Sequence, residues 1–161
     1  VGASIYASAS AKGPSPAVNI FVGGDVNIDF AGGTILGVSA SIPGPPIPTS
    51  RSAVAVSLTG GAGIDGEFSP SELRILGETI AHESGHFMGL FHPVEIEGFS
   101  GLVVDEDPLP DTNSCSSFTQ CQADPSLAGN LMFPFPVGDD IPQDQLTGQQ
   151  AGVLNRYAAV D

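Results

Sequence analysis

The chain has 161 residues, a length typical of one domain with a single hydrophobic core. It carries 4 Lys plus Arg against 18 Asp plus Glu, which gives a formal net charge of -14. A negative field of this size repels phosphate backbones and anionic lipids, and no run approaches the roughly 18 apolar residues of a membrane span. We therefore expect neither nucleic-acid binding nor a membrane span. For the oligomeric state, we favour a monomer.

The first part of the chain predicts a small mixed β-sheet. Short β-type runs are separated by Gly-rich and Pro-rich breaks, and several alternate apolar with small or polar residues, as half-buried strands do. The runs cover residues 18–22, 26–30, 34–42 and 53–58. A Gly-rich connector over residues 60–65 follows them.

A helix is predicted to begin after this connector. Ser69 and Glu72 have the spacing of a capping box, and Pro70 occupies the first helical position, where its missing N–H has no consequence. His82 and His86 lie on the face opposite to the apolar residues of this helix and are expected to face a cleft. The apolar residues share one face, which we expect to pack against the sheet: Leu73, Leu76, Ile80 and Phe87.

Residues 82–92 read H-E-S-G-H-F-M-G-L-F-H and contain all three histidines of the chain. His82 and His86 are four residues apart, so on a helix they can bind one metal ion together. If the helix continued, His92 would lie about 120° round and roughly 9 Å further along the axis, too far to share that ion. We therefore predict that the helix ends at Gly89, which can adopt the left-handed conformation. Three imidazoles with a fourth position open to water are the arrangement of catalytic zinc.

This donor set predicts hydrolysis of a peptide bond. Zinc lowers the pKa of its bound water to about 7 and polarises a carbonyl group. Glu83 lies beside the metal without ligating it. We expect Glu83 to take the proton of the water as general base and to deliver it to the leaving amine.

Residues 93–146 are rich in Asp, Pro, Gly and Ser and predict mostly loop. Cys115 and Cys121 predict a small-loop disulfide, with a free thiol pair or a cysteine held over zinc as a latency switch as the alternatives. A cluster of oxygen donors in the same half suits calcium, and the alternative is a solvated run of charge. Its members are Glu95, Glu97, Asp105, Glu106, Asp107, Asp111 and Thr112.

A C-terminal helix is predicted over residues 149–159. Thr147 and Gln150 have capping-box spacing, and Val153, Leu154 and Tyr157 recur at helical intervals.

The complete H-E-x-x-H-x-x-G-x-x-H pattern, followed by a candidate Met-turn at residues 130–132 (N-L-M), resembles the metzincin metalloproteases. The segment 107–112 (D-P-L-P-D-T), the cysteine pair and the L-T-G-Q stretch after the Met-turn resemble the pappalysin (cytophagalysin) branch. The resemblance implies an α+β, zincin-type catalytic domain over residues 1–161. Its N-terminal subdomain, residues 1–92, would hold a small mixed sheet backed by the zinc helix. The loop-rich C-terminal subdomain, residues 93–161, would hold the Met-turn and the C-terminal helix.

The resemblance also implies roles for single residues. Met132 would form an apolar base beneath the three histidines, and Tyr157 would support the oxyanion, because Pro134 stands where several metzincins have a tyrosine; otherwise zinc acts alone. A peptide substrate would lie extended along an edge strand formed by Gly37, Val38, Ser39, Ala40 and Ser41. Calcium is implied near Glu97, Asp107, Asp111 and Thr112.

The function implied by this resemblance is that of a secreted zinc endopeptidase acting on peptides or proteins. The chain opens at Val1 rather than Met, so we expect either a processed product, from which a signal or propeptide has been removed, or an expressed fragment. The alternative is a zincin-fold protein with weak or no catalysis that binds a protein partner in the cleft.

Overall fold

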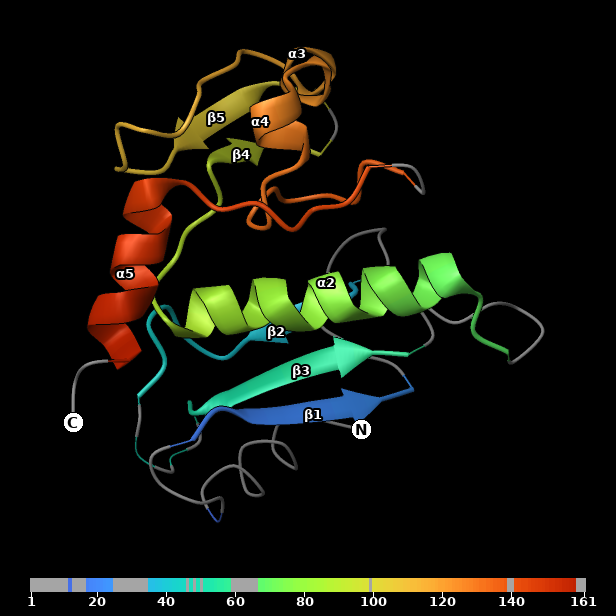
Figure 1. Ribbon diagram of the computed structural model, residues 1–161, viewed down its shortest axis with the longest axis vertical. Helices are drawn as coiled ribbons and strands as arrows, with labels where there is room; N and C mark the ends of the chain where they lie inside the picture. Colours follow the sequence, from blue (N-terminus) through green and yellow to red (C-terminus); the bar gives the residue numbers. More distant parts are fainter. Residues whose placement is uncertain are drawn as a thin grey trace. The chain divides into compact units, whose positions relative to one another are not determined.

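The computed structural model describes residues 12, 17–24, 35–45, 47, 49, 51–58, 67–98, 100–138 and 141–158. The chain divides into two compact units, residues 1–89 and residues 90–161 (Figure 1). The subdomain boundary expected after His92 lies three residues beyond this division. The predicted run 26–30 and the connector 60–65 lie outside the described residues.

A three-stranded mixed sheet belongs to the first unit, as the sequence predicts. Its strands are β1 (Asn19–Gly23), β2 (Gly37–Ser39) and β3 (Ala53–Ser57). The order is β1-β3-β2, with β3 parallel to β1 and antiparallel to β2. All five residues of β3 are buried, which fits a central strand of alternating alanine and valine. We expect residues 37–41 to border a substrate. The first three of them form β2, which is an edge strand among the described strands of this sheet.

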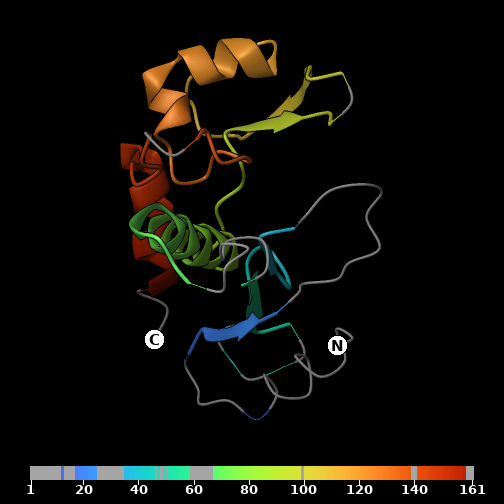
Figure 2. The same ribbon diagram turned by 90° about the vertical axis from the view of Figure 1, so that its right-hand side faces the viewer.

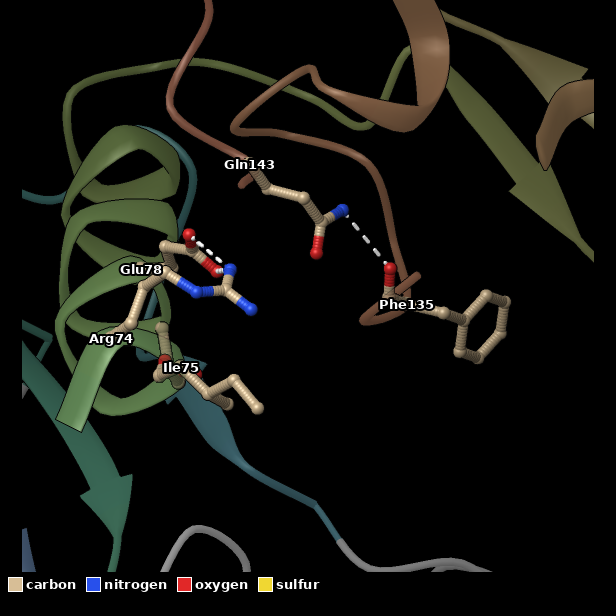
Figure 3. A network of polar contacts seen from close by, with 6 residues as sticks. Arg74, Ile75, Glu78, Phe135 and Gln143 are labelled. Carbon is tan, nitrogen blue, oxygen red and sulfur yellow. Dashed lines mark hydrogen bonds and ion pairs between the residues drawn. The ribbon is translucent and has the colours of Figure 1, made fainter. Parts of the chain in front are cut away.

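The helix α2 (Pro70–Phe87) packs on one face of this sheet (Figure 1). Figure 2 views this helix nearly along its axis, with the strands of the unit on one side of it. The predicted capping box is confirmed: the Glu72 N–H donates to the Ser69 hydroxyl, and the Ser69 N–H donates to the Glu72 carboxylate. One turn further, the Arg74 guanidinium donates to the Glu78 carboxylate at 2.7 Å (Figure 3).

The buried face of α2 differs from the prediction at its first turn. Leu73 is 54% exposed, so the expectation that it packs against the sheet is wrong. The close approach between helix and sheet occurs later in the helix. A Cβ added at Gly37 in β2 would lie 2.6 Å from the Cγ of Glu83 and 2.9 Å from the Cγ2 of Thr79.

The described part of residues 93–146 is mostly loop, as the sequence predicts, but it also holds short elements that the sequence did not indicate. Residues 93–146, expected to be mostly loop, include β4 (Val94–Ile96), β5 (Val103–Glu106), α3 (Phe118–Ala123) and α4 (Pro125–Ala128). The two strands pair antiparallel, with an irregularity between Glu95 and Ile96. Each of these elements is too short to produce a recognisable period in the sequence, which is why the prediction missed them.

A small core holds the second unit together. The predicted disulfide between Cys115 and Cys121 is present, and both cysteines are buried in this core. The core residues are Val94, Cys115, Cys121, Leu127 and Phe133. This disulfide excludes a free thiol pair and a cysteine latency switch in the folded chain.

The helix α5 (Gly148–Ala158) confirms the predicted C-terminal helix. The Gln150 N–H donates to the Thr147 hydroxyl, and the Thr147 N–H donates to the side-chain oxygen of Gln150, so the second capping box is also present. Gln150 is fully buried and exchanges side-chain hydrogen bonds with Asn130. This amide pair joins α5 to the segment before Met132.

The Gln143 side chain donates to the backbone carbonyl of Phe135 at 3.0 Å (Figure 3).

None of the helices that the structure describes is long and apolar enough to cross a membrane.

Candidate metal centre

The histidine motif occupies the end of α2 and the turn that follows it. His82 and His86 lie in the last turns of the helix, and Met88 is the C-cap residue. Gly89 has a φ of 102°, so the predicted termination by a left-handed glycine is confirmed. The Met88 N–H donates to the carbonyl of Ser84, and the Gly89 N–H donates to that of His86. The chain then turns toward His92.

The structure brings the three histidines together. Their candidate ligand atoms all lie within 4.8 Å of one another, and no other group of three or more His, Cys, Asp or Glu in the described part of the chain does so. With tetrahedral angles and a zinc–nitrogen distance of about 2.0–2.1 Å, two ligand nitrogens are about 3.4 Å apart. The observed separations are therefore within reach of a single ion. The rings of His82 and His86 meet edge to face, with centroids 4.7 Å apart.

Glu83 directly follows His82 in α2 and is buried. Glu83 is only 7% exposed, and burial raises the pKa of its carboxyl group to about 7. A hydrogen bond from the Ser39 backbone on β2 opposes this rise, and Gly37 on the same strand leaves room for the Glu83 side chain. A carboxylate whose pKa lies near neutrality is suited to taking and returning a proton. The sequence predicted Glu83 but not the support from β2.

The raised pKa of Glu83 predicts a pH-dependent stability of the metal-free protein. Between about pH 4.5 and 7 the folded chain keeps a proton that the unfolded chain has released, so the free energy of unfolding falls as the pH rises, by on the order of 3 kcal/mol. Glu83→Gln removes this contribution. Urea unfolding in the presence of a chelator should therefore show the variant more stable than the wild type at about pH 8, with the difference absent at about pH 4. If the stability of the two proteins depended on pH in the same way, this would contradict a raised pKa of Glu83 in the folded protein.

His92 has a close acidic neighbour. Its Nδ1 lies 2.8 Å from the Oε1 of Glu95, three residues later at the centre of β4. The sequence placed Glu95 only among the acidic residues of the second half. Only the three-residue spacing between His92 and Glu95 could have indicated this contact. Such a spacing is common in sequences, so by itself it does not predict a contact.

The residues expected near calcium are distributed over separate contacts. Asp111 accepts from the Thr147 hydroxyl and the Gln149 N–H, so it holds the beginning of α5. Glu97 accepts from the Ser100 hydroxyl. In the described part of the chain these carboxylates do not form a group of three.

Asp107 differs from the other acidic residues. Its Oδ1 accepts from the Leu109 N–H and from the Thr112 hydroxyl, whereas its Oδ2 is buried without a hydrogen-bond partner. The carboxylate lines a pocket of about 240 Å³, which Pro93 and Asn113 also border. A buried, unpartnered carboxylate oxygen is compatible with a cation.

Two residues with expected roles lie in the second unit. Met132 is fully buried, and its N–H donates to the side-chain oxygen of Asn130. Tyr157 is half-buried on α5, and burial raises the pKa of its hydroxyl. A place for Met132 beneath the histidines and a role for Tyr157 at the oxyanion stay predictions.

Comparison of the chain with protein-family models, with curated proteins and with solved structures finds no match. The geometry of the three histidines and of Glu83 therefore carries the functional argument.

Proposed function

We propose that this protein is a zinc-dependent endopeptidase of the metzincin type. The observation that carries the proposal is that the ligand atoms of His82, His86 and His92 lie within 4.8 Å of one another, in a motif whose Glu83 is buried. Three neutral imidazoles suit zinc, and a set of three protein ligands leaves a position for water or substrate, as in catalytic zinc sites. The α+β architecture with a mixed sheet and a long helix is compatible with this proposal.

The reaction follows from the donor set and from Glu83. A zinc ion bound by the histidines would supply the Lewis acidity that lowers the pKa of water to about 7 and polarises the scissile carbonyl. Glu83 takes the proton of the attacking water on its carboxylate and passes it to the leaving amine. The burial that favours the protonated form of Glu83 in the metal-free protein is compatible with a carboxyl group that holds the proton between the two transfers.

The position of the substrate is proposed from the sheet. β2 is an edge strand among the described strands and contacts Glu83 through the Ser39 backbone. An extended peptide that pairs with residues 37–41 would bring a backbone carbonyl close to this carboxylate. The disulfide supports a secreted protein, since disulfides persist in oxidising compartments. Calcium is proposed for the Asp107 pocket, because of the buried Oδ2 atom.

One experiment separates this proposal from its alternative, a zincin-fold protein that binds a partner without cleaving it. The zinc content of the purified protein is measured, and digestion of casein and gelatin is followed with and without a chelator. We expect one zinc ion per chain and cleavage that stops with the chelator and returns with added zinc. Stoichiometric zinc without cleavage of a broad peptide library would favour the binding protein.

A further inference from the structure

We propose that Glu95 is a positioning residue that fixes the ring of His92 for metal binding. The inference rests on the proposed zinc site and adds a residue outside the H-E-x-x-H-x-x-G-x-x-H pattern. Its basis is the 2.8 Å contact between the Nδ1 of His92 and the Oε1 of Glu95. This distance is that of a short charge-assisted hydrogen bond.

The backbone holds the two residues in a fixed relation. Pro93 and Val94, which separate them, are buried, and Val94 belongs to the core of the second unit. β4 is paired with β5, so that Glu95 lies opposite Asp105. The Asp107 N–H also donates to the carbonyl of Pro93 at 3.1 Å. Glu95 thus projects toward His92 from a strand that is anchored on both sides.

The contact determines which ring nitrogen binds metal. An ionised carboxylate only accepts hydrogen bonds, so the Nδ1 of a neutral His92 must carry the proton that is shared with Glu95. The lone pair of the ring is then on Nε2, and a metal bound by His92 takes this atom. A carboxylate behind a ligating histidine also raises the basicity of the ligand, and losing such a partner lowers metal affinity by about 10- to 100-fold.

The same contact contributes little to folding. The Glu95 side chain is 50% exposed, and ion pairs at exposed positions stabilise proteins only weakly. Changes at Glu95 should therefore leave a folded chain whose zinc binding can be measured. This separates a positioning role from a structural one.

The test compares three variants with the wild type. Zinc affinity is measured by competition with a chromogenic chelator, and the ring nitrogens of His92 are observed by NMR in the metal-free protein at about pH 8. Glu95→Ala removes the acceptor, and Glu95→Gln keeps a neutral acceptor. Asp105→Asn is the matched control, because it removes one negative charge at the paired position on β5.

We expect zinc affinity to fall about 10- to 100-fold in Glu95→Ala, with a smaller loss in Glu95→Gln and a change within about two-fold in Asp105→Asn. The Nδ1–H tautomer of His92 should dominate in the wild type and lose its preference in Glu95→Ala. Wild-type affinity and an unchanged tautomer in Glu95→Ala would overturn the role of Glu95, as would an equal loss in Asp105→Asn. Absence of zinc binding by the wild-type protein would instead overturn the proposed function.

Discussion

Replacing Glu83 with glutamine is expected to lower the rate of peptide hydrolysis by about 10²- to 10⁴-fold, the range that general acid–base catalysis contributes. Glutamine has nearly the same shape but cannot accept and return the proton. The carboxylate is not one of the three metal ligands, so the zinc content should stay at one ion per chain. The loss should appear in kcat, measured with a fluorogenic peptide on zinc-loaded protein.

Glu72→Gln is the matched control for this experiment. It removes a carboxylate charge from the same helix, and glutamine can keep the capping-box hydrogen bond to Ser69. The activity of this variant should equal that of the wild type. Near-normal proteolysis by zinc-loaded Glu83→Gln would show that another group moves the proton.

Replacing His92 with alanine is expected to abolish zinc binding at micromolar zinc while the metal-free chain still folds. Loss of a direct ligand must lower the affinity by more than the about 10- to 100-fold that follows loss of an outer partner. Binding to the folded state alone stabilises a protein by about 2.7 kcal/mol when the ligand concentration is 100 times the Kd. In zinc at about 100 times the wild-type Kd, the wild-type protein should therefore unfold at a higher urea concentration than without zinc. The urea concentration at which His92→Ala unfolds should not change when zinc is added.

Phe91→Ala is a suitable control for this second experiment. Phe91 precedes His92 and is 50% exposed, so its removal alters the same turn without taking away a ligand. The zinc-dependent stabilisation should persist in this variant. An equal response of His92→Ala and wild type to zinc would show that the ion binds elsewhere.

Much of the site could be predicted because its determinants are local. The spacing of His82, His86 and His92 and the glycine at position 89 fix a helix, its end and a turn within eleven residues. Capping boxes are also local, which explains why the starts of α2 and α5 were predicted correctly.

The features that were missed depend on contacts between distant residues or on short elements. The approach of β2 to Glu83 requires a glycine at position 37, which the sequence alone does not connect with the helix. β4 has only three residues, yet it places Glu95 against His92. The exposure of Leu73 cannot be recognised from the apolar periodicity of the helix alone.

The most direct test of the central claim is a crystal structure of the zinc-loaded protein, with the ion located by anomalous scattering. We predict one ion bound by nitrogens of His82, His86 and the Nε2 of His92 at about 2.0–2.1 Å, with water at a fourth position. An ion bound without His92, or with the fourth position filled by a protein side chain, would contradict the account.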